Sequence, residues 1–243
     1  MAMRTLRPYQ SDIVDRVRNA YLHGYKAPCV VLPCGGGKSV IVAEIAKRTT
    51  AKRNHVLFLV HRKELVDQIQ NTFDFWGVDM NNADIMMVQT ASRRIERLQK
   101  PALIITDEGH HSKAATYRKI YDAFPNAHRL GVTATPVRLD GSGLGDVNDI
   151  LVEGVSAKWL IEHHYLAPYD YYAPSIADLT GIKIQHGEYE TKSMEKALLR
   201  TAVFGDAIKH YRQLADGKQA ICYCVSVNHS YACLLYTSPS PRD

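Results

Sequence analysis

Three consecutive glycines followed by a lysine and a serine form the segment with the clearest chemical meaning in this chain. The segment spans residues 33–39 and reads Pro-Cys-Gly-Gly-Gly-Lys-Ser. Glycines let backbone N–H groups curl around an anion without a Cβ in the way. Lys38 can reach the outer phosphates of a nucleotide, and the Ser39 hydroxyl can ligate Mg²⁺. We therefore predict a phosphate-binding loop, because a plain flexible turn explains the glycines but not the Gly-Lys-Ser at a helix start.

Adjacent carboxylates at the end of an apolar run form a second candidate group. Asp107 and Glu108 stand side by side, with His110 and His111 close behind. A carboxylate at a strand end beside a phosphate loop can help to hold Mg²⁺, and its neighbour can polarise the attacking water. Two alternatives stay open: plain turn residues, or a transition-metal site made by Asp107 and the two histidines.

Apolar runs and helical periodicity indicate the elements that position these residues. Continuous apolar runs predict buried parallel strands, and apolar residues at helical spacing predict helices. The alternation of the two patterns predicts an α/β fold. Predicted strands cover residues 29–32, 56–60, 85–88, 102–106 and 128–132, and predicted helices include residues 40–48, 156–162 and 201–214. Ligands of open parallel sheets bind beyond the carboxyl ends of the strands, which is where both candidate groups lie.

Polar and basic residues follow two other predicted strands. His61 and Arg62 come after the second strand, and Gln89 and Thr90 come after the third. Such groups position a nucleic-acid backbone, although each segment alone also fits a solvated helix start or a helix cap. Near the N-terminus, the amide of Gln10 could read an adenine edge because it donates and accepts hydrogen bonds together.

Net charge, cysteine content and the absence of long apolar runs limit the classes of protein to which the chain can belong. The chain has 243 residues and a formal net charge of +5, which fits an anionic partner such as nucleic acid and also an ordinary solvated surface. Its five scattered cysteines predict free thiols in a reducing compartment. Cys222 and Cys224 have no second ligand pair at zinc spacing. With neither a signal core nor a membrane-length apolar run, we expect a cytoplasmic protein.

The C-terminal third carries weaker signals. Residues 169–172 and 220–225 are predicted strands, and residues 181–190 are a predicted polar loop. Ser226 follows the second of these strands, where it could contact nucleic acid or simply cap a helix. Residues 234–243 are rich in proline and serine, which is typical of a disordered tail.

Six segments occur in the order seen in superfamily 2 helicases. They are Arg7-Pro8-Tyr9-Gln10, the glycine loop at 33–39, Val-His-Arg-Lys-Glu-Leu-Val-Asp-Gln at 60–68, Val88-Gln89-Thr90, Asp107-Glu108-Gly109-His110 and Thr133-Ala134-Thr135-Pro136. The set resembles the branch that includes bacterial and phage DEAD/DEAH-box-like helicases and the motor subunits of type I and type III restriction enzymes. The resemblance covers the first domain fully and residues 156–229 more loosely. Cys34 and Gly109 depart from the residues commonest in the family.

The resemblance implies two RecA-like domains with ATP and Mg²⁺ in the cleft between them. ATP would be bound by Arg7, Gln10, Pro33, Cys34, Gly35, Gly36, Gly37, Lys38 and Ser39. Mg²⁺ would be held by Ser39 and Asp107, and catalysis would use Lys38, Asp107, Glu108 and His110. Coupling of hydrolysis to movement would use Thr133, Ala134 and Thr135. A nucleic-acid strand, with DNA favoured over RNA, would be gripped by His61, Arg62, Gln89, Thr90 and Ser226.

The resemblance also predicts how the chain is divided. We expect a RecA-like ATP-binding domain at 1–152, a linker with an incomplete second RecA-like domain at 153–233, and a disordered or non-native tail at 234–243. The family's arginine finger has no match, so we expect a truncated helicase or translocase that hydrolyses ATP weakly. Two alternatives stay open: a restriction-type subunit that moves on duplex DNA, or a non-catalytic fragment that binds ATP and nucleic acid.

Overall fold

The computed structural model describes residues 5–107, 115–135, 144–172, 184–185, 188–190 and 209–231. The chain divides into two compact units, residues 1–168 and residues 169–243. The expected tail at 234–243 lies outside the described residues. The functional division of the chain near residue 152 stays a prediction.

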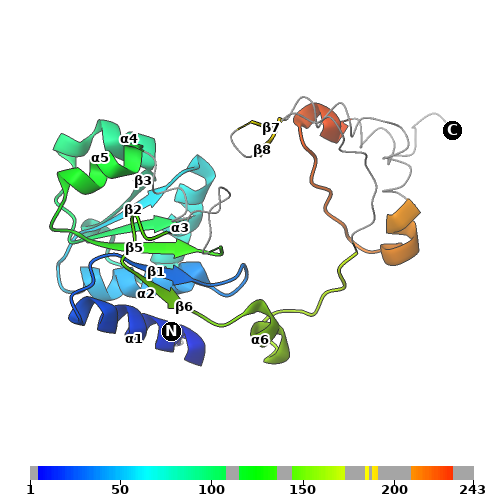
Figure 1. Ribbon diagram of the computed structural model, residues 1–243, viewed down its shortest axis with the longest axis horizontal. Helices are drawn as coiled ribbons and strands as arrows, with labels where there is room; N and C mark the ends of the chain where they lie inside the picture. The colour runs from blue at the N-terminus through cyan, green and yellow to red at the C-terminus, as the bar shows by residue number, and fades with distance from the viewer. Residues whose placement is uncertain are drawn as a thin grey trace. The chain divides into compact units, whose positions relative to one another are not determined.

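A six-stranded parallel sheet forms the centre of the first unit (Figure 1), and it confirms the α/β prediction. Its spatial order is β3-β2-β4-β5-β1-β6. The strands are β1 (Pro28–Val31), β2 (Val56–Val60), β3 (Ala83–Met87), β4 (Leu103–Asp107), β5 (His128–Thr133) and β6 (Ile150–Glu153). The first five match the predicted strands closely, whereas β6 was not predicted.

Helices cover both faces of this sheet. In Figure 1, α1 (Pro8–Leu22) and α2 (Lys38–Thr50) lie on one side, and α4 (Val88–Arg93) and α5 (Ala115–Ala123) lie on the other. Helix α3 (Lys63–Trp76) packs against α2, so it belongs to the first layer. Two short 3-10 turns, η1 (Met80–Asn82) and η2 (Ile95–Arg97), precede β3 and follow α4.

The core follows from the alternation of side chains along the strands. Phe58 in β2 faces the α1–α3 layer, where its ring meets Phe73 of α3 edge-on with centroids 5.8 Å apart. Its neighbours Leu57 and Leu59 belong to the core on the α4–α5 side. Successive residues of a strand point to opposite faces, so a strand covered on both sides must be apolar throughout. This explains why β2 reads as an unbroken apolar run.

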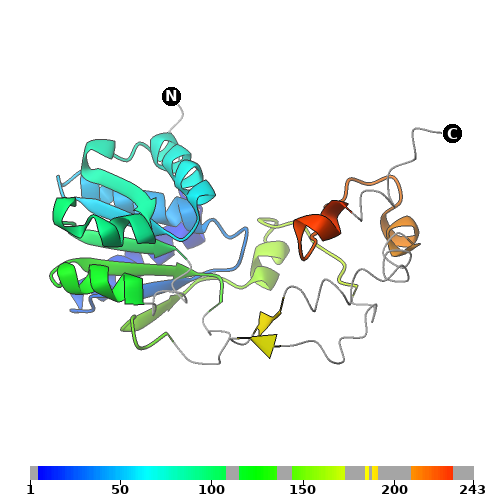
Figure 2. The same ribbon diagram turned by 90° about the horizontal axis from the view of Figure 1, so that it is seen from above.

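Helix α6 (Ala157–Glu162) follows β6 and belongs to the first unit. The Ser156 hydroxyl accepts a hydrogen bond from the backbone N–H of Trp159 at 3.1 Å, so Ser156 caps the start of the predicted helix. Figures 1 and 2 both show α6 beside the loop that follows β1. The residues just after β6 are therefore placed next to the predicted phosphate loop.

Two strands predicted for the second unit are wrong. Residues 169–172 and 219–224 have no regular structure, and Ile221 and Tyr223 are 78% and 92% exposed. Strand backbone groups need a neighbouring strand to pair with, and within the described ranges no strand lies beside either segment.

The rest of the described second unit is short. The helix expected at 201–214 is confirmed over its described part, residues 209–214, and it continues to residue 215. Residues 227–231 are also helical. The expected polar loop contains a small antiparallel pair, β7 (Ile184–Gln185) and β8 (Glu188–Tyr189).

In the part of the chain that the structure describes, no helix has the length and apolar character needed to cross a membrane. The same part holds no cluster of His, Cys, Asp or Glu arranged to bind a metal ion. Cys29 and Cys34 are free thiols, with Cys29 buried in β1 and Cys34 exposed in the loop that follows it.

Candidate nucleotide and nucleic-acid sites

The glycine loop joins β1 to α2 and folds as the sequence predicts. The N–H of Gly36 donates to the carbonyl of Pro33 at 3.1 Å, which closes a turn. Gly35 and Gly37 have φ angles of 78° and 86°, in the left-handed region that other residues avoid. Gly37 is the residue immediately before α2, so the loop leads the chain directly into the helix.

Close packing leaves no room for side chains on the glycines of this loop. A Cβ on Gly36 would lie 2.7 Å from Cγ of Leu32, and a Cβ on Gly37 would overlap the side-chain amide of Gln10. The backbone of the loop is therefore bare beside the first turn of α2. That helix start carries Lys38 and Ser39, and the Lys38 ammonium donates to the carbonyl of Leu32 at 3.3 Å. Bare N–H groups, a helix N-terminus and a lysine together fit a phosphate group.

The start of α1 is tied to this loop. The hydroxyl of Tyr9 donates to the carbonyl of Gly36 at 2.8 Å, and the amide of Gln10 approaches the same carbonyl at 3.4 Å. The Oε1 atom of Gln10 accepts from the backbone N–H of Arg7 at 3.0 Å. Tyr9 and Gln10 are both buried. The structure thus brings Gln10, the predicted adenine reader, to the predicted phosphate loop beside Tyr9, for which no role was predicted.

Two neighbouring strands bring the other predicted groups to the same edge of the sheet. The spatial order places β4, β5 and β1 side by side, and Asp107 at the end of β4 is in register with Val132 of β5. The N–H of Leu32 donates to the carbonyl of Thr133 at 3.0 Å, which joins the strand before the glycine loop to the end of β5. Thr133 is buried, and its hydroxyl donates to the carbonyl of Thr135 at 3.0 Å, so the turn through Ala134 is fixed.

Helix α5 packs two tyrosines behind the strand that ends in Asp107. The hydroxyls of Tyr121 and Thr106 are 2.8 Å apart and both residues are buried. Burial raises the pKa of Tyr117, and the negative charges of Tyr121 and Asp107 add to that effect. Burial likewise raises the pKa of Tyr121. Glu108, Gly109 and His110 lie outside the described residues.

The predicted nucleic-acid residues follow the other two neighbouring strands, β2 and β3. Arg62 is the N-cap residue of α3 and is exposed, and His61 before it is half-buried. Gln89 and Thr90 lie in the first turn of α4. Because β2 pairs with β3 in parallel, the structure brings these four residues to one end of the sheet.

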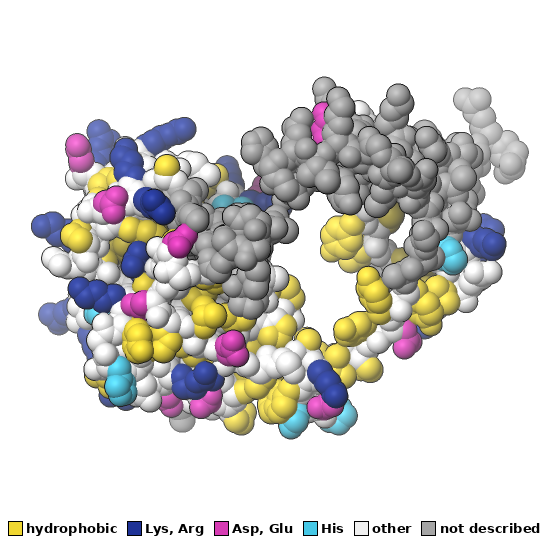
Figure 3. Space-filling model, in the orientation of Figure 1, with side chains coloured by type: hydrophobic (Ala, Val, Ile, Leu, Met, Phe, Trp, Pro, Cys, Tyr) yellow, Lys and Arg dark blue, Asp and Glu magenta, His cyan; other side chains and the backbone are white. Residues whose placement is uncertain are grey.

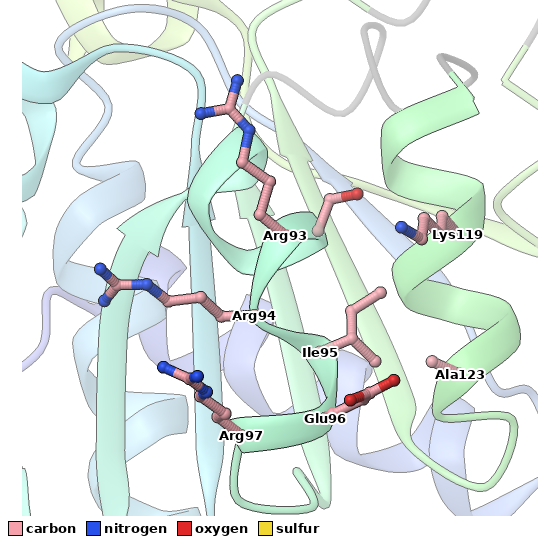
Figure 4. A pocket seen from close by; sticks show the side chains of 8 residues that line it. Arg93, Arg94, Ile95, Glu96, Arg97, Lys119 and Ala123 are labelled. Carbon is pink, nitrogen blue, oxygen red and sulfur yellow. The ribbon is translucent and has the colours of Figure 1, made fainter.

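A basic pocket continues from α4. It has a volume of about 570 Å³ and lies between the α4–η2 segment and α5. Figure 4 shows Arg94 and Arg97 on the α4–η2 side and Lys119 on α5, with Glu96 as the acidic member of the lining. None of its four cations, Arg93 included, forms an ion pair within residues 5–107 and 115–135. Many Lys and Arg side chains cover this part of the molecule (Figure 3).

A protein-family model matches residues 3–138, which are more than half of the chain. Its description is "Type III restriction enzyme, res subunit" (ResIII). The chain belongs to the ResIII family. This places it among the superfamily 2 helicases related to type I and type III restriction motor subunits. The residues matched by the ResIII model include the glycine loop, the strands β2 to β5 and the basic pocket.

Two individual proteins are similar to this ResIII chain over most of its length. A "51.5 kDa protein" of a Lactococcus phage is 48% identical over 198 residues, which cover 82% of this chain and 44% of the relative. The "Type I restriction enzyme EcoAI endonuclease subunit" of Escherichia coli is 25% identical over 266 residues, covering 92% of this chain and 33% of the relative. The chain therefore spans less than half the length of either relative.

A solved structure supports the fold of this ResIII chain. The Pyrococcus furiosus Hef helicase domain matches with a TM-score of 0.54 and 20% identity, covering 86% of this chain and 48% of that one. At this level of identity the match supports a similar RecA-like fold and nothing about function.

One predicted site residue lies in the second unit of this ResIII chain. The hydroxyl of Ser226 accepts from the backbone N–H of His229 at 3.0 Å, at the start of the helical residues 227–231. This is the helix-cap alternative that the sequence left open.

Proposed function

We propose that this chain binds ATP with Mg²⁺ and uses it to drive movement on nucleic acid. The observation that carries the proposal is the pair of contacts from Tyr9 and Gln10 to the carbonyl of Gly36. Through them the base-reading end of α1 and the phosphate loop form one continuous site. A loop that only bound an isolated phosphate would have no need of a buried amide beside it.

The proposed roles follow from position and charge. Lys38 supplies a positive charge at the start of α2, where the helix dipole adds to the attraction for phosphate. Ser39 and Asp107 would hold Mg²⁺ between the loop and the end of β4. By the resemblance, Glu108 would orient the attacking water, and His110 with Thr133, Ala134 and Thr135 would pass the change on to the nucleic acid.

Nucleic acid would be held at the ends of β2 and β3. His61 and Arg62 would contact phosphates from one strand end, and Gln89 and Thr90 from the next. The basic pocket extends this surface along α4 and into η2, because Arg93, the last residue of α4, lies three residues after Thr90. Cations that neutralise phosphates release counterions, so binding should weaken steeply with salt. We favour DNA because the EcoAI relative is a restriction endonuclease subunit.

A second candidate function is movement along duplex DNA without strand separation. The ResIII match and the EcoAI relative favour it, because both carry restriction-enzyme names. Displacement of a third strand from a triplex would report duplex translocation, whereas release of a labelled strand from a forked duplex would report unwinding.

Replacement of Lys38 by alanine tests the proposal, with Lys47→Ala as the matched control. Lys47 is an exposed lysine in the last turn of the same helix. The measurements are ATP affinity by calorimetry and ATPase rate without nucleic acid and with single-stranded DNA, duplex DNA or RNA. We expect Lys38→Ala alone to lose ATP binding and any stimulated turnover.

Nucleic-acid affinity should survive in Lys38→Ala, because it depends on other cations. If wild-type protein binds no ATP, the proposal is wrong. If ATP binds but no nucleic acid changes the turnover, the protein is a nucleotide-binding fragment and not a motor.

A further inference from the structure

Arg7 rests on an aromatic ring that no sequence motif contains. The guanidinium carbon of Arg7 lies 4.8 Å from the ring centroid of Tyr165, a residue of the turn that follows α6. A guanidinium stacks readily on the face of a tyrosine. The same guanidinium donates a hydrogen bond to the hydroxyl of Tyr9 at 3.3 Å, and Arg7 is exposed, which leaves its side chain accessible to a ligand.

Tyr165 is itself held on several sides. Its ring stacks on Trp159 of α6 with centroids 5.8 Å apart and an angle of 21° between the planes. Tyr9 meets it edge-on at 5.2 Å. Its backbone N–H donates to the carbonyl of the fully buried Leu160 at 2.8 Å. The tyrosine is therefore a fixed platform for the guanidinium of Arg7.

The next residue reaches the phosphate end of the same site. Leu166 lies so close to the glycine loop that a Cβ on Gly35 would come within 2.5 Å of its Cδ2. The N–H of Leu166 donates to the same Leu160 carbonyl at 3.1 Å. The turn after α6 thus touches both ends of the candidate nucleotide site, although it is distant from either in the sequence.

We propose that Tyr165 is a positioning residue that holds the Arg7 guanidinium flat, so that its other face stacks on the base of the bound nucleotide. The inference rests on the proposed ATP site and adds a residue to it. Base stacking on an arginine plane is sequence-tolerant and needs the plane to be held in place. Without the tyrosine, only the hydrogen bond to Tyr9 would restrain the guanidinium, so Arg7 would stack on the base for a smaller part of the time.

The test compares a ligand that has a base with one that has none. Calorimetry measures the affinity of the full 243-residue chain for ATP and for inorganic tripolyphosphate, both with Mg²⁺. We expect Tyr165→Ala to weaken ATP binding roughly 2- to 30-fold, the factor that corresponds to one lost cation–aromatic contact. Tripolyphosphate should bind as it does to wild type. Tyr165→Phe keeps the ring and should keep both affinities.

Three further variants separate positioning from plain structural support. Arg7→Lys keeps the charge but loses the plane, so it should reproduce the loss of ATP affinity and can stand in for Tyr165→Ala should that variant not fold. The double variant should lose no more than either single one, because both remove the same contact. Tyr25→Ala, a partly exposed tyrosine just before β1, is the control.

Equal loss of ATP and tripolyphosphate in Tyr165→Ala would overturn the inference, since the ring would then support the loop and not the base. Unchanged ATP affinity in both Tyr165→Ala and Arg7→Lys would overturn it as well. Failure of wild-type protein to bind ATP is a different result, which defeats the proposed function first.

Discussion

Replacing Gly37 with alanine offers a sharp test of the glycine loop, because the chain supplies its own control. Gly37 before α2 and Gly77 after α3 both have left-handed backbones, with φ angles of 86° and 70°. An alanine in this conformation costs roughly 1–2 kcal/mol wherever it stands. A Cβ on Gly77 meets nothing within 4 Å, whereas a Cβ on Gly37 overlaps the amide of Gln10.

The expected magnitudes differ accordingly. Gly77→Ala should lose only the backbone cost of roughly 1–2 kcal/mol, a factor of about 5–30 in the unfolding equilibrium. In Gly37→Ala the amide of Gln10 must also move, which disturbs its bonds to Arg7 and Gly36. Each lost bond adds about 1 kcal/mol, so the total should reach roughly 2–4 kcal/mol.

Urea unfolding and ATP calorimetry on the two variants measure both effects. Gly37→Ala should be the less stable variant and should bind ATP much more weakly, whereas Gly77→Ala should bind ATP like wild type. The reasoning is refuted if the two variants show equal stability and equal ATP affinity, since the close approach of Gln10 to the loop would then have no energetic weight.

Three other predictions follow from contacts of the first unit. Tyr9→Phe leaves the carbonyl of Gly36 without its 2.8 Å partner and should cost about 1–3 kcal/mol in urea unfolding, together with some ATP affinity. Burial lowers the pKa of His55, so the unfolded chain takes up a proton before the folded chain does as the pH falls below about 6.5. The free energy of unfolding, measured in urea, should therefore decrease below that pH. The decrease should be smaller in His55→Gln. Arg97→Gln in the basic pocket should reduce the salt dependence of single-stranded DNA binding by about 0.7 in log–log slope, whereas Arg18→Gln on exposed α1 should leave it unchanged.

The strands and the loop that form the candidate nucleotide site could be predicted from the sequence because their causes are local. An unbroken apolar run such as β2 is required wherever a strand is covered on both faces. Left-handed backbone in the loop requires glycine at positions 35 and 37. Strand β6 was not predicted, because it is short and buries only one side chain, Val152.

Tertiary contacts had no such local cause. Nothing in the types of Tyr9, Tyr165 or Leu166 shows that they meet at one loop, because those contacts exist only once α1 and α6 pack on the sheet. The error at residues 220–225 has the opposite origin. The apolar run at 220–225 favours an extended strand, but a strand forms only where a neighbouring strand is available to pair with it.

The place of β1 in the sheet has a consequence for how the protein folds. The strand that leads into the phosphate loop is among the first segments made, yet its partners are β5 and β6, with Cys29 facing Gly131 more than a hundred positions later. Long-range parallel pairing is slow, because the intervening chain must be ordered before the contact forms. During synthesis the residues of β1 cannot become buried until most of the first unit has been made. Nucleotide binding should therefore be one of the last properties acquired on folding, and ATP affinity measured during refolding should report completion of the sheet.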